Sequence, residues 1–430
     1  MIAAERRLAR VGWNALSRLG AQVWAKALSL VLAPLVVRLA GPTELGRYLM
    51  ALTVTSIVAA VTDLGLTIYL TREGAQIQDP IRNRRFLGDI LVMKTGLAAL
   101  GYGLLAAVAP VLPLPEVTRQ LLPIAGLALV PEAATAALHA FLNARQRMDL
   151  SSGILAIVRL VATAGALLAL TTGKAAAAIL WWHVTGTVAG TLISLSVLWA
   201  KFGSPIIQPG ALLHRRTLRQ HLVEALPFAA TGFIAMLYRR LDLLLLGSWH
   251  GELVAGWYGA ATRLWEAVHL VPASLLDALF PEMSRMASQP GGRQRLRLLL
   301  KGGGAVLFAG GSGLAVLGAL GGPQGLRLIY GAGVADATVQ TWQVLVWAIP
   351  AIFLYLLGGH TLYAVREQRA VTGRMVVVAL VNAVANLVLI ARWRHIGAAM
   401  VLLASEWLLC LLLYGRAWRV VAMEEEQHET

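Results

Sequence analysis

The chain has 430 residues, of which 58% are hydrophobic and 14% are charged, and its net charge is +15. Soluble globular proteins carry roughly 25% charged residues, so this chain has too little polar surface to cover a soluble core. Apolar stretches of about 20 residues, the length of a membrane-crossing helix, recur from end to end. A transmembrane barrel would instead show alternating segments of about 10 residues. The composition therefore predicts an all-α integral membrane protein.

We expect twelve transmembrane helices. The first apolar segment is long and carries Arg18 and Lys26, so it is expected to be a retained helix and not a cleaved signal peptide. The ninth is rich in glycine, which membrane helices tolerate because small residues let helices pack closely. The expected spans are 16–38, 47–70, 86–110, 119–142, 152–172, 175–199, 221–246, 253–280, 302–320, 339–364, 371–391 and 396–415.

The charges of the loops predict the orientation of these spans. If the N-terminus is cytoplasmic, the cytoplasmic segments hold 23 Lys and Arg residues and the external segments hold 7. Cytoplasmic loops of membrane proteins carry such an excess. The pattern predicts that both termini are cytoplasmic, and it accounts for most of the positive charge without nucleic acid as a partner.

The longest polar break divides the chain into two halves of six spans each. We expect an N-terminal bundle (1–200), a cytoplasmic linker (201–220) and a C-terminal bundle with a short cytoplasmic tail (221–430). An even number of spans per half predicts a pseudo-two-fold axis along the membrane normal, as in some secondary transporters. Two such bundles leave a cleft between them, where charged side chains can lie in water.

Two pairs of sequence stretches echo each other between the halves. GPTELGRYLMA (41–51) follows the first span, and HGELVAGWYGAA (250–261) follows the seventh. NARQR (143–147) likewise resembles AVREQR (364–369). The echoes support an internal repeat.

Charged residues inside the spans are the candidates for function, since charge in hydrocarbon is costly. In the first span, Arg18 and Lys26 share one polar stripe with Gln22 and Ser29. Helix periodicity also places Arg263, Glu266, Ser274 and Asp277 on one face of the eighth span. Two interpretations stay open: the stripes line the cleft and attract an anionic substrate, or they form ion pairs between helices.

Other in-span charges also have two interpretations each. Lys94 is expected to extend its long stem to the headgroups, whereas Arg159 faces either the cavity or a structural partner. Asp63 either caps or pairs within the bundle, or binds a coupling ion. Arg239 and Asp242, three residues apart, either form an ion pair on the helix surface or contact the substrate.

The sequence contains no motif for covalent chemistry. It has no GxxxxGK[ST] loop, no HExxH motif and no paired cysteines, so we expect no catalytic residue, no metal site and no cofactor. Single polar residues in apolar helices are expected to be structural and hydrogen-bonded, namely Glu132, His183, His360 and Glu406.

Four stretches resemble the polysaccharide-export flippases, the Wzx-type transporters of lipid-linked oligosaccharides. That family belongs to the multidrug, oligosaccharidyl-lipid and polysaccharide exporter (MOP) superfamily, which includes the MATE transporters. The first helix also resembles that of the lipid II flippases, which have two further helices. The matching stretches, which cover most of the chain, are 38–73, 238–285, 328–359 and 382–409.

The resemblance implies two helical bundles, a cationic central cavity and alternating access. The implied substrate is an undecaprenyl-pyrophosphate-linked oligosaccharide, flipped from the inner to the outer leaflet of the bacterial cytoplasmic membrane for surface polysaccharide biosynthesis. In this interpretation four cations of the spans contact the headgroup. Other charged residues couple an ion to transport or form gating salt bridges. Implied partners are membrane lipid, a coupling ion (H⁺ or Na⁺), a polysaccharide polymerase and glycosyltransferases. The proposed contacts are Arg18, Lys26, Arg159 and Arg263; the coupling or gating candidates are Asp63, Arg239, Asp242, Glu266 and Asp277.

Three other functions are weighed against this one. An ion-coupled multidrug or cation antiporter of the same superfamily would need an acidic, aromatic-lined cavity, and the in-span cations argue against it. A glycosyltransferase or ligase acting on the same lipid carrier would need a sizeable external loop, which this chain lacks. A non-transporting scaffold for a polysaccharide machine is the third alternative.

Overall fold

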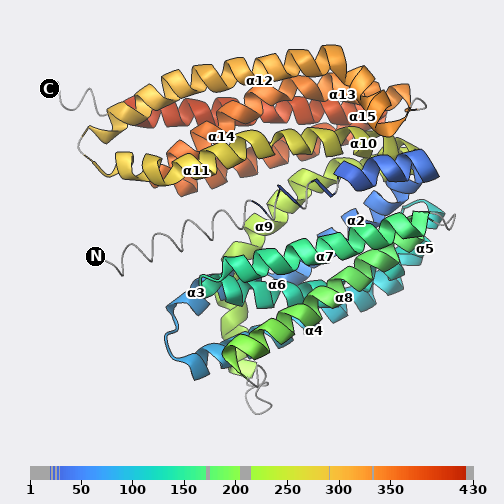
Figure 1. Ribbon diagram of the computed structural model, residues 1–430, viewed down its shortest axis with the longest axis vertical. Helices are drawn as coiled ribbons and strands as arrows, with labels where there is room; N and C mark the ends of the chain where they lie inside the picture. Colours follow the sequence, from blue (N-terminus) through green and yellow to red (C-terminus); the bar gives the residue numbers. More distant parts are fainter. Residues whose placement is uncertain are drawn as a thin grey trace. The chain divides into compact units, whose positions relative to one another are not determined.

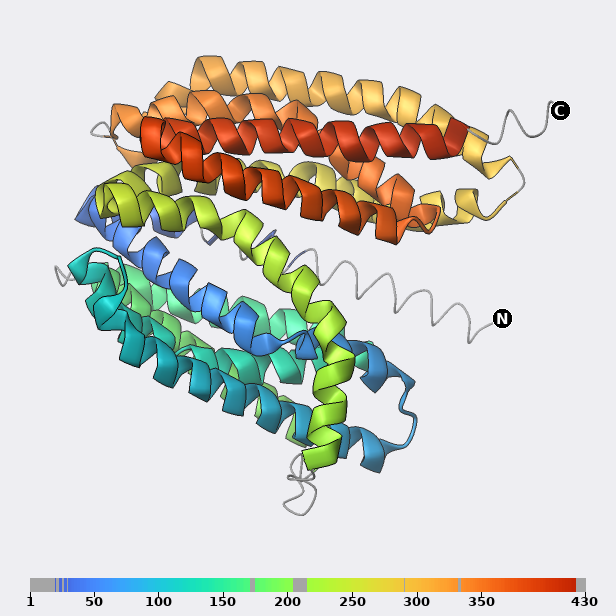
Figure 2. The ribbon, with the colours of Figure 1, turned by 180° about the vertical axis from the view of Figure 1, so that it is seen from behind.

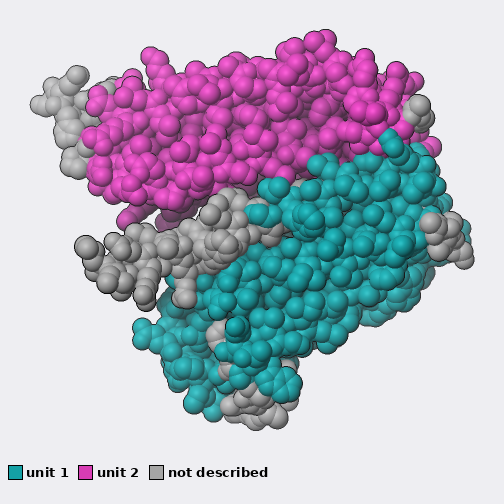
Figure 3. Space-filling model, in the orientation of Figure 1, with its two compact units in different colours: residues 1–236 teal, residues 237–430 magenta. Residues whose placement is uncertain are grey.

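The computed structural model describes residues 20, 23–24, 27–28, 30–170, 175–203, 215–289, 291–331 and 334–422, which form helices and no β-strand. The chain divides into two compact units, Met1–Met236 (unit 1) and Leu237–Thr430 (unit 2) (Figure 3). Each unit is a bundle of long helices (Figures 1 and 2; Figure 2 shows the molecule from behind). The expected division into six-span halves, with a linker at 201–220, stays a prediction.

Unit 1 is built around α6, which packs against α3, α4 and α8, while α7 packs against α8. Leu70, Ile90 and Leu138 are buried in the core that these helices share. The helices of this unit are α2 (Pro42–Asp63), α3 (Leu66–Gln76), α4 (Pro80–Val108), η1 (Ala109–Val111), α5 (Glu116–Gly126), α6 (Leu129–Ala144), α7 (Met148–Ala169), α8 (Ala175–Phe202) and the first part of α9 (Arg215–His250), preceded by a short helix, Leu30–Ala40.

Unit 2 is built around α14, which packs against α11, α12 and α15. Leu300, Leu357 and Leu413 are buried in its core. Its helices are the remainder of α9, then α10 (Glu252–Val268), α11 (Leu270–Ala287), α12 (Gly292–Tyr330), α13 (Asp336–Leu345), η3 (Val346–Ala348), α14 (Ile349–Ala364) and α15 (Gln368–Ala422).

The described helices confirm an all-helical membrane protein. Seven are long and apolar enough to cross a membrane, and two bent pairs pass the same test as single spans. α15 covers the last two expected spans. It consists of two helices, which the non-helical backbone of Arg394 (φ 50°, ψ −129°) separates. The second half of the first expected span forms the short helix Leu30–Ala40, whereas residues 16–19, 21–22, 25–26 and 29 lie outside the described residues. The architecture is compatible with the expected twelve spans.

Both sequence echoes are also echoes of backbone geometry. Gly41 precedes α2 with φ 91° and ψ 163°, and Gly251 precedes α10 with φ 88° and ψ 170°. At the second echo, Arg145 (φ −87°, ψ 10°) and Val365 (φ −87°, ψ 12°) each end a helix. In each loop the next residue has a positive φ, 55° and 66° respectively. Similar sequences therefore make similar turns in the two units.

A change of helix geometry within a span also recurs. The α5–α6 segment runs from residue 116 to 144, and the α13–α14 segment from residue 336 to 364, so both ends are displaced by 220 residues. Each segment changes after about three turns: α5 and α6 meet at a 45° bend around Leu127, and a 3-10 turn begins at Val346 within the continuous span 336–364. This change is therefore part of the repeat.

Gly65 sits at the break between α2 and α3, in a left-handed conformation with φ 76°. A Cβ atom there would lie 2.5 Å from the carbonyl oxygen of Ala225 and 2.7 Å from the backbone nitrogen of Ala229. Only glycine lets the first part of α9 approach the break this closely, because any side chain would meet backbone atoms.

We expect Gly65→Ala to lower the stability of unit 1 by at least about 1–2 kcal/mol, the cost of a left-handed conformation for a residue with a Cβ. Thermal unfolding of the purified protein, followed by size-exclusion chromatography, measures this. Gly96→Ala in α4 is the matched control, since no atom lies within 4 Å of the Cβ it would add. Equal melting temperatures for both variants would contradict the close approach.

Candidate functional site

The break between α2 and α3 holds a charged group of unit 1. Asp63, the last residue of α2, accepts a hydrogen bond from the Thr67 hydroxyl at 2.6 Å. Lys94 of α4 donates to both the Asp63 carboxylate and the Thr67 hydroxyl. Its side chain is only 2% exposed, so the prediction that Lys94 extends to the headgroups is wrong. Because the helix is interrupted there, Asp63 can turn toward α4. Its carboxylate then balances the charge of Lys94 inside the bundle.

A second group of charges joins α9 and α10 in unit 2. Arg240 of α9 interacts electrostatically with Asp242 of its own helix and with Arg263 and Glu266 of α10. We call these four residues the α9–α10 charge cluster. It combines two guanidinium groups with two carboxylates. The guanidinium group of Arg239 also acts on Arg240, so with Arg240 itself included, cations outnumber carboxylates here.

Asp242 does not pair with Arg239 as expected. Its carboxylate instead accepts hydrogen bonds from the hydroxyl of Tyr258 on α10 and from the backbone N–H of Leu243 at 2.7 Å. Arg239 has an exposed side chain, and no described residue pairs with it. The ion-pair interpretation is wrong because Asp242 turns toward α10, whereas Arg239 lies on a more open side of α9; the substrate-contact interpretation stays a prediction.

Removing the Tyr258 hydroxyl tests the contact with Asp242. We expect Tyr258→Phe to destabilise the protein by about 1–3 kcal/mol, because the buried carboxylate loses a hydrogen-bond donor. Tyr102→Phe in α4 is the control, since the Tyr102 hydroxyl has no hydrogen-bond partner among the described residues. A melting temperature of the Tyr258 variant as high as that of the control would show that this contact contributes nothing.

The predicted polar stripe of the eighth span is divided between two pairs. Arg263, 17% exposed, donates to Glu266 at 3.2 Å within α10. Asp277 lies on the separate helix α11 and pairs with His360 of α14 at 3.1 Å. Asp277 lies eleven residues beyond Glu266, about 16 Å along a helix, so the structure joins Arg263 to Glu266 but does not add Asp277 to them. The Asp277–His360 contact joins two helices, as the ion-pair interpretation expects, whereas Arg263 and Glu266 pair within one helix. Cavity lining stays a prediction.

The other three predicted headgroup contacts are placed only in part. Arg159 lies on α7 with an exposed side chain and has no hydrogen bond or ion pair with a described residue. Arg18 and Lys26 lie outside the described residues, so their stripe is untested. Of the four proposed headgroup contacts, Arg159 is thus the one that the structure describes without a hydrogen bond or ion pair to a described residue.

The structure contains two polar contacts that were not predicted, one between Glu132 and His183 and one network within α15. The carboxylate of Glu132 on α6 lies 3.1 Å from Nε2 of His183 on α8, which confirms that each is a satisfied residue. Within α15, Asn386 donates to Asn382 and Asn382 donates to Ser405, each at 2.9 Å. Asparagines four residues apart in an apolar run are a sequence signal that could have pointed to this buried network.

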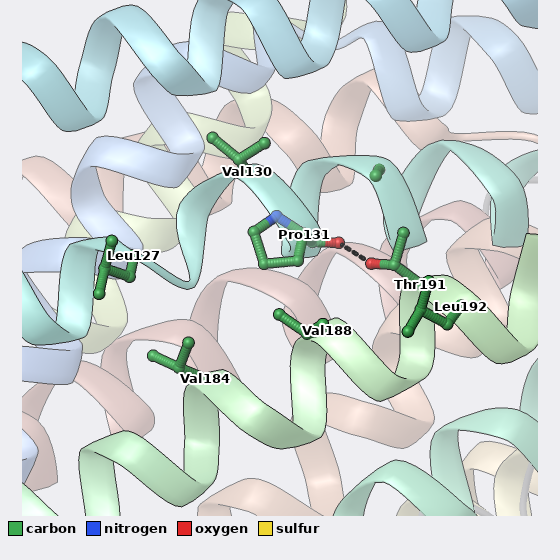
Figure 4. A pocket seen from close by; sticks show the side chains of 8 residues that line it. Leu127, Val130, Pro131, Val184, Val188, Thr191 and Leu192 are labelled. Atoms are coloured by element: carbon green, nitrogen blue, oxygen red, sulfur yellow. Dashed lines mark hydrogen bonds between the residues drawn. The ribbon is translucent and has the colours of Figure 1, made fainter.

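An apolar groove of about 380 Å³ lies between α6 and α8, beside the break before α6 (Figure 4). The Thr191 hydroxyl in it donates to the Pro131 carbonyl at 2.9 Å and so offers no donor to a ligand. A sugar or phosphate headgroup needs hydrogen-bonding partners, so this groove does not suit it. Its lining residues are Leu127, Val130, Pro131, Ala134, Val184, Val188, Thr191 and Leu192.

Several solved transporters share this fold. The lipid II flippase MurJ in its inward closed conformation matches with a TM-score of 0.76 at 13% identity, over 94% of this chain and 89% of that chain. An inward-facing multidrug resistance MATE family transporter of the MOP superfamily matches with a TM-score of 0.67 at 11% identity, over 96% and 99%. The MATE multidrug transporter DinF-BH matches with a TM-score of 0.63 at 14% identity, over 96% and 95%. At these identities the likeness shows the fold alone, and it confirms the expected MATE/MOP-like architecture.

The sequence itself assigns the family. No curated protein matches the sequence as a relative. The sequence pattern of the family described as "Polysaccharide biosynthesis protein" matches residues 11–287, well over half of the chain. With its apolar helices and MOP-type fold, this chain is a multi-pass membrane protein that belongs to the polysaccharide biosynthesis protein family.

Proposed function

We propose that this protein flips an undecaprenyl-pyrophosphate-linked oligosaccharide from the inner to the outer leaflet of the bacterial cytoplasmic membrane. The family match carries the proposal, because it places a transporter fold in polysaccharide biosynthesis. A pyrophosphate–sugar headgroup is anionic and cannot cross hydrocarbon unaided. The transporter would move it by alternating access, with both termini in the cytoplasm.

Four in-span cations are the proposed contacts for the pyrophosphate, namely Arg18, Lys26, Arg159 and Arg263. Arginine suits this role because its planar guanidinium binds phosphate oxygens through two parallel hydrogen bonds. In the described structure Arg263 is bound to Glu266. The arriving phosphate would compete with this carboxylate, so that the pair opens as the headgroup binds.

Ion coupling would supply the driving force. The coupling ion is H⁺ or Na⁺, and its candidate sites or gates are Asp63, Arg239, Asp242, Glu266 and Asp277. A polysaccharide polymerase and glycosyltransferases would act before and after the transport step.

A reconstituted system tests the proposal. The purified protein is placed in liposomes that contain a fluorescent undecaprenyl-pyrophosphate oligosaccharide, and a membrane-impermeant glycosidase is added outside. We expect the enzyme to cleave the inner-leaflet fraction as well as the outer one, at a rate that rises with the amount of protein. Protection of the inner fraction equal to that in protein-free liposomes would contradict flipping.

The second candidate is an ion-coupled multidrug or cation antiporter, favoured by the likeness to MATE multidrug transporters. A susceptibility panel of cationic drugs on a strain that overproduces the protein separates the two functions. Flipping predicts unchanged susceptibility, whereas an antiporter predicts resistance.

A further inference from the structure

Glu406 is a buried carboxyl group inside unit 2. It lies in the second half of α15, and only 2% of it is exposed. The hydroxyl of Tyr238 from α9 donates to its Oε1 at 3.3 Å, and the hydroxyl of Tyr355 from α14 faces the same carboxyl. Its Oε2 is buried and has no hydrogen-bond partner. Three helices thus enclose one carboxyl group and leave one of its oxygens unused.

In the part of the chain that the structure describes, no counter-charge faces Glu406. The titratable groups that face it are Tyr238 of α9 and Tyr355 of α14, and in the described part of the chain no lysine, arginine or histidine joins them. The nearest acid in this network is Asp242, which interacts with Tyr238 and is itself bound to Tyr258. An ionised carboxylate buried in such a place has no cation beside it among the described residues, which strongly disfavours the charged form.

The contrast with three acids that are more exposed is informative, since their side chains are 28% (Asp63), 41% (Glu132) and 51% (Asp277) exposed. Asp63 is bound to Lys94, Glu132 to His183 and Asp277 to His360, so each has a cationic or basic partner. Glu406 has hydroxyl groups instead. Ionisable residues within a membrane are costly, and they commonly mark ion or proton pathways.

We propose that Glu406 is a proton-binding site of unit 2 and couples proton movement to transport. The carboxyl keeps its proton while Tyr238 and Tyr355 enclose it. When α9 or α14 moves away from α15, water reaches the group, the O–H bond breaks and the proton passes to water. The coupling rests on the proposed flipping function, whereas the proton site does not.

The first experiment detects the proton directly. Infrared spectroscopy of the purified protein in lipid shows the C=O stretching band of a neutral carboxyl group, and Glu406→Gln should remove one such band at neutral pH. Glu132→Gln is the matched control, since the Glu132 side chain is 41% exposed and paired with His183. A spectrum of the Glu406 variant that retains every neutral-carboxyl band overturns the proton site. Tyr238→Phe should shift the band without removing it.

The second experiment measures coupling in liposomes with the lipid-linked oligosaccharide. With the wild-type protein, a gradient of about one pH unit should change the steady-state ratio of substrate between the two leaflets about tenfold. This is the effect of coupling one proton to each transport cycle. Glu406→Gln should give the same distribution with and without the gradient, while Glu132→Gln should behave as the wild type.

The outcomes separate the two proposals. If the band is lost but the Glu406 variant still responds to the gradient, Glu406 does not couple transport. If the wild type moves no substrate and the band assignment holds, the proton site stands and flipping fails.

Discussion

Replacing Lys94 by methionine is expected to destabilise the protein by about 3 kcal/mol, which is the low end of the range for breaking a buried ion pair. The variant leaves the Asp63 carboxylate without its cation, next to apolar helices. The low end applies because the Asp63 side chain is 28% exposed and keeps its hydrogen bond from Thr67. Thermal unfolding in detergent, followed by size-exclusion chromatography, measures the loss.

A double variant makes this prediction specific. Adding Asp63→Asn to Lys94→Met removes the unpaired charge, so the double variant should be more stable than Lys94→Met alone. This coupling is the signature of a direct interaction in a double-mutant cycle. If the two substitutions simply add, the buried pair does not contribute to the stability of unit 1.

Arg263→Ala is expected to lower the rate of flipping at least about tenfold, since hydrogen bonds to charged groups contribute about 1.5–3 kcal/mol. The variant should keep near-normal stability, because the Arg263 side chain is partly exposed and its partner Glu266 lies on the same helix. The liposome assay with the fluorescent lipid-linked oligosaccharide measures the rate.

Arg285→Ala is the control for Arg263. Arg285 forms the same kind of pair, with Glu282 three residues earlier, but its side chain lies at the exposed end of α11. Loss of transport in the Arg285 variant, or full transport in the Arg263 variant at an equal protein level, would remove Arg263 from the substrate site.

Much of the fold follows from the apolar stretches, because each helix that crosses a bilayer must satisfy its own backbone hydrogen bonds. The breaks inside the spans do not follow. Leu64 adopts a left-handed conformation at the end of α2, and nothing in the local sequence except Gly65 signals it. The helix α12, at 292–330, extends well beyond the apolar window expected for it, because its charged ends remain helical.

The candidate site was less accessible to prediction. Helix periodicity placed Arg263 and Glu266 on one face, and the structure pairs them. It could not show that Lys94 meets Asp63, because the two residues belong to different helices and the helix break turns one toward the other. The same reason hid the enclosure of Glu406 by Tyr238: contacts between distant helices depend on packing and not on spacing.

A strain that lacks this protein gives the most direct test of flipping. Its undecaprenyl-linked glycans are isolated, and their accessibility from each side of the membrane shows which leaflet holds them. Flipping predicts that the glycans accumulate on the cytoplasmic face, that surface polysaccharide is lost, and that the wild-type protein restores it. Normal surface polysaccharide with no trapped intermediate, in a strain without a second transporter of this family, would contradict it.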